Sequence, residues 1–217
     1  MTYKIDLHTH SIASPDGGLR MVDYATMISE GRLDFVAITD HNRIDFALEA
    51  QRELGDAIIV GEEINTLEGE MIGLFLKEPV PPGLTARETA ERIHAQRGLV
   101  YIPHPFETVR KGMTDSALYK VAPLVDIIEI YNGRALFQSR SHMSEKWAAQ
   151  HHCPGASSSD AHGKVGWGNT YSEIGSLPRI GTLAQALRHA RYRRELVGLR
   201  GIIYPKYNRL RKLLAHA

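Results

Sequence analysis

Short apolar runs alternate with segments of helical periodicity along most of this chain. The strand-like apolar runs cover residues 3–7, 35–38, 57–60, 71–76, 99–102 and 125–131, and a further short run begins at Ala156. Apolar residues recur at helical spacing in segments 21–33, 43–54, 85–96, 136–151 and 181–193. Alternation of this kind predicts a βα-built domain with a largely parallel sheet.

Length and composition limit the classes of protein to consider. The chain has 217 residues, which suits a single domain over 1–217, with a basic C-terminal helix expected over 200–217. A net charge of +1 gives no general argument for nucleic acid or an anionic membrane as partner. The one cysteine, Cys153, fits a reducing compartment, so we expect a cytoplasmic location. We expect no signal peptide before the strand at Tyr3, and no apolar run approaches the roughly 18 residues of a membrane span.

Two histidines follow the first strand-like run at a spacing of two. Residues two apart in an extended segment point to the same side, so His8 and His10 can both reach one ion. Imidazole is the commonest metal ligand in proteins. The pair therefore predicts a metal site, provided that other ligands converge on it.

Metal-capable side chains also follow the other predicted strands. His41 follows the run at 35–38, Glu63 the run at 57–60, and His104 the run at 99–102, while Asp160 and His162 follow the short run that begins at Ala156. In parallel βα architectures the C-terminal ends of the strands share one face, and sites are built there. We therefore expect residues more than 150 positions apart to converge.

In order, spacing and position, these motifs resemble those of the PHP family, the polymerase and histidinol phosphatase metal-dependent phosphoesterases. The resemblance covers Tyr3 to about Ser172 and rests on His8-Thr9-His10, Asp40-His41, Glu63, His104 and Asp160-Ala161-His162. It implies an α/β fold, a distorted (β/α)7 PHP-type barrel, with up to three metal ions at the C-terminal ends of the strands.

The resemblance also implies a ligand set, carried over residue by residue. His8, His10, Glu63 and Asp160 resemble the ligands of a first site, and Glu63 would bridge to a second site that holds His104. Asp16, His41 and His162 resemble the ligands of a third site. The catalytic centre is then expected to comprise His8, His10, Glu63, Asp160 and His162.

Glu70 is a departure from the family pattern. Many relatives have a histidine in a Gly-His-Ile/Val segment after the bridging glutamate, where this chain has Gly69-Glu70-Met71-Ile72. A carboxylate ligand there would favour harder ions such as Mn²⁺, but Glu70 is also compatible with an ordinary surface position on a strand. Asp16 has a similar alternative, because a Pro-Asp-Gly sequence often shapes a turn.

The ligand types indicate the chemistry. Imidazole and carboxylate together suit two to three Zn²⁺, Mn²⁺ or Fe²⁺ ions, and water bound to such an ion has a pKa of roughly 7. Arg110, Lys111 and Arg134, with Asn132 as a further donor, are the candidates to bind a substrate phosphate; the alternative is that the three cations are solvated loop charges. Asp40 is expected to stand behind the ligands and orient an imidazole.

The preferred hypothesis is a metal-dependent phosphoesterase that hydrolyses a phosphomonoester, or a nucleotide or oligonucleotide phosphate, with hydroxide activated in a di- or trinuclear centre. Its expected partner is a small phosphorylated substrate, such as a nucleotide or short oligonucleotide, with no membrane and no obligate protein partner. Two alternatives are an amidohydrolase, which the terminal Asp-x-His and the glutamate in place of a lysine disfavour, and a non-catalytic metal-binding accessory module. The basic stretch 200–212 is either a solvated helix face or a patch for a polyanionic substrate.

Overall fold

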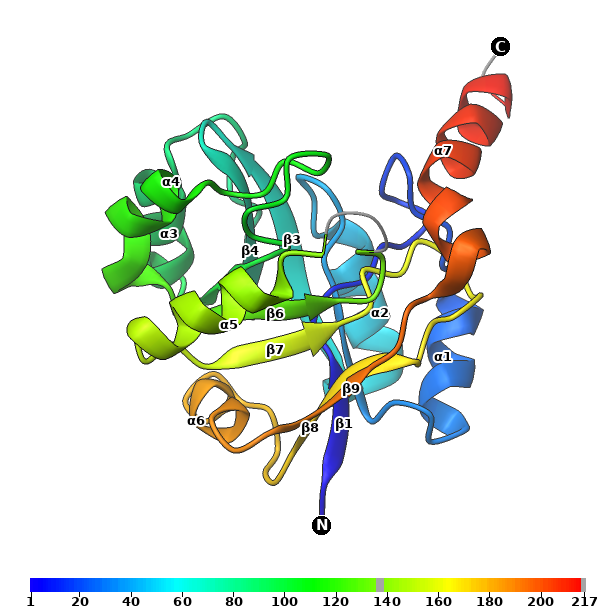
Figure 1. Cartoon of the computed structure of the whole chain (residues 1–217). Coiled ribbons are helices and arrows are strands. Elements are labelled where there is room, and N and C mark those ends of the chain that lie inside the picture. The colour runs from blue at the N-terminus through cyan, green and yellow to red at the C-terminus, as the bar shows by residue number, and fades with distance from the viewer. Residues whose placement is uncertain (136–138, 216–217) are drawn as a thin grey trace.

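The computed structural model describes residues 1–135 and 139–215, and nine strands within them form one strongly curved sheet (Figure 1). Its strand order is β7-β6-β5-β4-β3-β2-β1-β8-β9. The strands are β1 (Tyr3–Asp6), β2 (Phe35–Ile38), β3 (Ile58–Thr66), β4 (Gly69–Leu74), β5 (Leu99–Ile102), β6 (Ile127–Asn132), β7 (Gly155–Ser158), β8 (Thr170–Ile174) and β9 (Arg191–Arg194).

The sheet is mixed rather than wholly parallel, and it nearly closes into a barrel. Strands β1, β2 and β3 pair in parallel, as do β5, β6 and β7, whereas β4 runs antiparallel to both of its neighbours and β8 antiparallel to β1 and β9. The two ends of the sheet meet through serine side chains. The Ser157 amide on β7 donates to the Ser172 hydroxyl on β8 at 2.9 Å, and the Ser157 hydroxyl donates to the Arg193 carbonyl on β9 at 2.8 Å.

Seven α-helices lie within the described residues. They are α1 (Met21–Ser29), α2 (Asp45–Leu54), α3 (Ala86–Ala95), α4 (Asp115–Val121), α5 (Ser141–Gln150), α6 (Leu183–Leu187) and α7 (Gly198–Ala215). Helix α3 begins with a reciprocal capping box: the Glu88 amide donates to the Thr85 hydroxyl, and the Thr85 amide donates to the Glu88 carboxylate. None of the described helices combines the length and apolarity needed to cross a membrane.

Three details differ from the sequence-based expectations. The prediction of a helix over 181–193 is wrong in its second half, because the chain leaves α6 and forms β9, which pairs with β8. Strand β8 was not predicted, because its buried residues include Thr170 and Ser172 and the segment therefore lacks an apolar run. The hydroxyl groups of these two residues donate hydrogen bonds to neighbouring backbone carbonyls. The helix predicted over 136–151 is described from residue 141, and residues 136–138 lie outside the described part.

Strand alternation separates two apolar layers. Ile58 and Val60 of β3 lie on the outer face of the sheet, in the apolar core between the sheet and the helices. Ile59 lies on the inner face and packs inside the barrel with Ile72 and Tyr101. Leu183 and Leu187 of α6 complete the inner core. The inside of the barrel is therefore apolar at the end where the parallel strands begin. The inward-facing residues near the C-terminal ends of these strands lie at the other end, which we call the barrel mouth.

Candidate metal centre

Three glutamates lie on the inner face of the barrel, between its apolar interior and its mouth. Along β3 the inward sequence is Ile59, Gly61 and Glu63, so Glu63 points into the barrel while its neighbour Glu62 points outward. By the same alternation Ile127 leads to Glu129 on β6. Because β4 runs antiparallel, its first residues lie beside the last residues of β3, and this brings Glu70 to the same mouth.

The loops after β1, β2 and β7 are tied together at the mouth. The His10 amide donates to the Ala161 carbonyl at 2.9 Å, and the Thr39 amide donates to the Thr9 carbonyl at 2.9 Å. A parallel bridge also joins His41 to Glu63. These backbone bonds bring together side chains that the sequence separates by more than 150 residues, as expected.

Glu63 lies at the centre of the cluster and contacts four histidines with its two oxygens. Oε2 is 3.2 Å from His10 Nε2, 3.5 Å from His8 Nε2 and 3.3 Å from His41 Nδ1. Oε1 is 3.0 Å from His104 Nε2. Burial by itself would raise the pKa of Glu63, but the surrounding imidazoles, His8 and His41 foremost, hold it well below its usual range. An ionised carboxylate with its oxygens turned to different histidines has the geometry of a bridging ligand.

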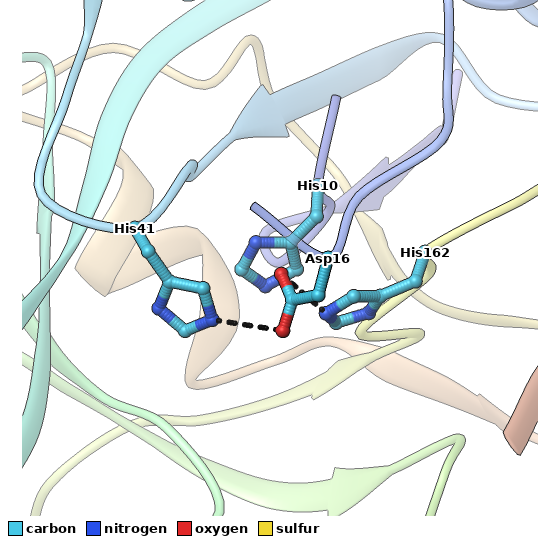
Figure 2. Close-up of side chains that lie close together, drawn as sticks. All are labelled: His10, Asp16, His41 and His162. Atoms are coloured by element: carbon cyan, nitrogen blue, oxygen red, sulfur yellow. Dashed lines mark ion pairs between the residues drawn. The ribbon is translucent and has the colours of Figure 1, made fainter. Parts of the chain in front are cut away.

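Asp16 joins two histidines on the side of the cluster away from His104. Its Oδ2 is 3.6 Å from His41 Nε2 and its Oδ1 is 3.5 Å from His162 Nε2. Figure 2 shows these three residues turned toward one another around His10, whose ring stacks on that of His162 at 4.1 Å between centroids. Asp16 is buried, so this arrangement favours the ligand interpretation over a simple turn.

Asp160 divides its two oxygens between the histidines and two arginines. Oδ1 is 3.5 Å from Nε2 of both His8 and His10. Oδ2 accepts hydrogen bonds from Arg110 at 2.5 Å and is 3.1 Å from Arg134 Nη1. The backbone of Asp160 has φ of 53°, a left-handed conformation that a non-glycine residue adopts at some cost.

Glu70 is buried and lies 3.7 Å from His104 Nε2 and 4.0 Å from His41 Nδ1. Burial raises the pKa of Glu70, and the charge of Glu63 raises it further. Because Glu70 is buried, the alternative of an exposed surface residue is excluded.

Two acidic residues that support the cluster were missed from the sequence. Glu129 is buried and accepts hydrogen bonds from the Tyr101 hydroxyl at 2.9 Å and the His104 amide at 2.6 Å. Asp6 accepts hydrogen bonds from Ser159 and Trp167, which hold the loop before Asp160. The available signal was an acid flanked by apolar residues within a strand run, as at Glu129 between Ile128 and Ile130.

Asp40 supports the centre through a different partner from the one expected. Its carboxylate accepts hydrogen bonds from the Ser11 amide at 2.7 Å and the Ser11 hydroxyl at 2.5 Å, rather than orienting an imidazole. It therefore holds the backbone that follows His10.

The described residues fit a group of divalent ions. Four sets have one ligand atom from each member within 4.8 Å of one another: His10 with Asp16, His41 and His162; His8 with His10 and Glu63; His8 with His104 and Asp160; and Glu63 with Glu70 and His104. All nine ligand candidates from the sequence fall in these sets. Nδ1 of His41 and Nδ1 of His104 are buried without a hydrogen-bond partner. Buried imidazole nitrogens together with carboxylate oxygens are a suitable donor set for Zn²⁺, Mn²⁺ or Fe²⁺.

The remaining substrate candidates lie at different depths. Arg110 is mostly buried and bonds to Asn132 Oδ1 at 2.8 Å and to the Glu107 carboxylate, besides Asp160. Asn132 also donates to Glu129 at 2.8 Å. Lys111 is exposed and donates to Asn65 Oδ1 at 3.0 Å. Arg110, Arg134 and Asn132 thus border the cluster, whereas Lys111 lies at the rim.

Two archaeal proteins from Methanocaldococcus jannaschii are related to the chain in sequence. It is 36% identical to the uncharacterized protein MJ1587 in an alignment of 143 residues that covers 59% of this chain and 81% of that protein. It is 33% identical to the uncharacterized protein MJ0417 in an alignment of 185 residues that covers 80% of this chain and 71% of that protein. The chain belongs to the family of these two proteins. It matches no protein-family model.

Similar solved structures identify the fold of this family member as PHP-type. A two-domain protein from Bacteroides vulgatus containing a predicted PHP-like metal-dependent phosphoesterase matches 96% of this chain and 70% of its own, with TM-score 0.73 and 18% identity. Endonuclease Q in complex with a 27-mer duplex bearing an abasic lesion matches 88% of this chain and 58% of its own, with TM-score 0.64 and 17% identity. A protein from Chromobacterium violaceum described as an amidohydrolase matches 73% of this chain and 87% of its own, with TM-score 0.57 and 16% identity. The predicted barrel fold is confirmed.

Proposed function

We propose that this protein is a metal-dependent phosphoesterase that hydrolyses a phosphomonoester, or the phosphate of a nucleotide or short oligonucleotide. The observation that carries the proposal is the set of four overlapping ligand groups, with Glu63 shared between two of them, at the strand ends of a PHP-type barrel. The solved structures with this fold include a protein containing a predicted PHP-like phosphoesterase and an endonuclease bound to a 27-mer duplex, which supports phosphate ester chemistry.

The ligands we assign are His8, His10, Asp16, His41, Glu63, Glu70, His104, Asp160 and His162. Bound divalent ions would supply activation of the attacking water and neutralisation of phosphate charge. Among the ligands, His8, His10, Glu63, Asp160 and His162 would form the catalytic core. Glu63 would keep its charge in this role, because the imidazoles around it lower its pKa.

Substrate phosphate would be held by the cations at the border of the cluster. Arg134 is 13% exposed, and its Nη1 lies 3.1 Å from both Asp160 Oδ2 and His162 Nδ1, while its Nε is buried without a hydrogen-bond partner. A guanidinium so placed can offer a phosphate oxygen the N–H groups of its other terminal nitrogen while Nη1 stays on Asp160. Arg110 and Asn132 would contribute on the same side, and Lys111 would meet a longer substrate at the rim.

The test is hydrolysis of p-nitrophenyl phosphate, nucleotides and short oligonucleotides by protein reconstituted with Mn²⁺, Zn²⁺ or Fe²⁺. His8→Ala and Asp160→Asn should each abolish turnover, with a barrier increase of several kcal/mol, because each removes a ligand. Circular dichroism should show the fold intact. The matched control is His189→Ala, since His189 is exposed and remote from the cluster in the chain. Metal content near zero in wild-type protein grown with added Mn²⁺ and Zn²⁺ would refute the proposal, as would full turnover by either ligand variant.

A further inference from the structure

Helix α7 lies against the two loops that carry Asp16 and His162, as Figure 1 shows for the loop after β1. Asn208 of α7 is 46 residues from His162 and 192 residues from Asp16 in the sequence, and the resemblance to the PHP family ends near Ser172. The side chains of Asn208, Arg209 and Lys212 make hydrogen bonds from α7 to these loops.

Asn208 is 2% exposed on a helix whose neighbouring side chains Tyr207 and Leu210 are more than half exposed. Its Nδ2 donates to the carbonyl of Asp16 at 2.8 Å and to the carbonyl of His162 at 2.9 Å. One amide group therefore holds the backbones of two proposed ligands at a set separation. Both amide hydrogens are used in doing so.

Lys212 holds the other end of the Asp16 loop. Its ammonium group donates to three backbone carbonyls, those of Ile12 at 2.7 Å, Ser14 at 2.5 Å and Gly17 at 2.9 Å. Three donors on one ammonium match three converging acceptors, so the loop closes around Lys212. Arg209 adds an ion pair to Asp16 Oδ2 at 2.7 Å.

Glycines make the close approach of α7 feasible. A Cβ on Gly18 would lie 2.8 Å from Asn208 Nδ2 and 2.9 Å from the His162 carbonyl oxygen. A Cβ on Gly163 would lie 2.6 Å from the ring of Tyr204 on α7. The two loops and the helix therefore fit only with these positions free of side chains.

We propose that α7 is a positioning element of the metal centre, in which Asn208 and Lys212 set the separation of Asp16 and His162 and thereby the affinity of the ion held by His10, Asp16, His41 and His162. This inference rests on the proposed metal centre. The other three ligand groups have no member on the loop that Lys212 closes, so α7 acts on one ion selectively.

The first experiment uses Asn208→Leu, which keeps side-chain size and charge and removes the amide donors. Metal-free protein is titrated with Mn²⁺ by calorimetry, and bound metal is counted after dialysis. We expect the affinity for one ion to fall about 10- to 100-fold, the range for loss of a group that orients a ligand, while the other ions stay bound. Excess Mn²⁺ should restore turnover without changing the substrate KM.

The second experiment compares Lys212→Met with Lys206→Met. Both remove one positive charge from α7, and the exposed side chain of Lys206 has no hydrogen bond or ion pair to the described residues. Loss of a cation should by itself strengthen binding of a positive ion. If Lys212→Met binds one ion more weakly and Lys206→Met binds all ions as the wild type does, the loss comes from the missing hydrogen bonds of Lys212 to the Asp16 loop and not from the missing charge.

A third arm identifies the ion. Asp16→Asn should weaken the same ion, and adding Asn208→Leu to it should weaken binding by less than the sum of the two separate effects, since both act on the same ligand group. The α7 proposal is overturned if neither α7 variant weakens an ion, if all ions weaken together, or if Asp16→Asn changes nothing. Wild-type protein that binds no metal at all instead refutes the proposed function.

Discussion

The carboxylate of Glu129 lies 3.2 Å from Nδ1 of His8, on the side of the ring opposite the other proposed ligands. Nε2 of the same ring faces His10, Glu63 and Asp160. A buried carboxylate behind an imidazole fixes which nitrogen carries the proton and leaves the other free for an ion. Glu129 thus has the orienting role that the sequence had suggested for Asp40.

Glu129→Gln should therefore weaken metal binding without removing a ligand. Glutamine retains the size of the side chain, but its amide cannot hold the His8 N–H as a carboxylate does. We expect metal affinity to fall about 10- to 100-fold and turnover to recover in excess metal. Competition with a coloured chelator measures the affinity. An unchanged chelator titration would show that Glu129 only packs the barrel.

Glu70→His should shift the metal preference of the centre. Glu70 lies beside Glu63 and His104, where it would offer an ion an oxygen ligand in place of an imidazole nitrogen, and oxygen ligands favour hard ions. Replacement by imidazole should move the activity optimum from Mn²⁺ towards Zn²⁺. Rates measured in each metal provide the test, and an identical order of preference would mean that Glu70 is not a ligand.

Arg134→Lys should lower kcat/KM while leaving metal content unchanged. Lysine keeps a positive charge beside Asp160, but it cannot reproduce the planar guanidinium, which can pair with Asp160 through one nitrogen and with a phosphate oxygen through another. We expect a loss of about 1 to 3 kcal/mol in transition-state binding. Arg87→Lys, at an exposed position on α3, is the control. A kinetically silent Arg134→Lys would place the phosphate clamp elsewhere.

Glu62→Gln should stabilise the protein at neutral pH more than at acid pH. Burial raises the pKa of Glu62 from 4.5 to about 7, against the hydrogen bond from the Val80 amide, which lowers it. The folded state then holds a proton that the unfolded state has released, so this group costs stability as the pH rises from 4.5 to 7.

The difference between Glu62→Gln and wild type should grow across that window by on the order of 2 to 3 kcal/mol. Urea unfolding of metal-free protein at pH 5 and pH 8 measures it. Glu53→Gln, an exposed position on α2, should show little change at either pH. A pH-independent difference would mean that Glu62 is ionised in the folded protein.

The sequence by itself determined the class of fold and most of the side chains that meet at the barrel mouth. Both depend on local rules: apolar runs form buried strands, and residues at the C-terminal ends of parallel strands share one face. His8, His41, His104 and Asp160 obey these rules, and the structure brings them together. Glu63 could be separated from Glu62 because alternation along one strand is also local.

Only the tertiary structure decided the direction of β4, the partner of Asp40 and the places of Glu129 and α7. Glu70 reaches the mouth because β4 runs antiparallel, a choice set by pairing with β3 and β5 that no pattern within 71–76 reveals. Glu129 points at His8 across 121 residues, and Asn208 bonds to Asp16 across 192. Such contacts depend on how the sheet curves and where the last helix packs, which are properties of the whole chain.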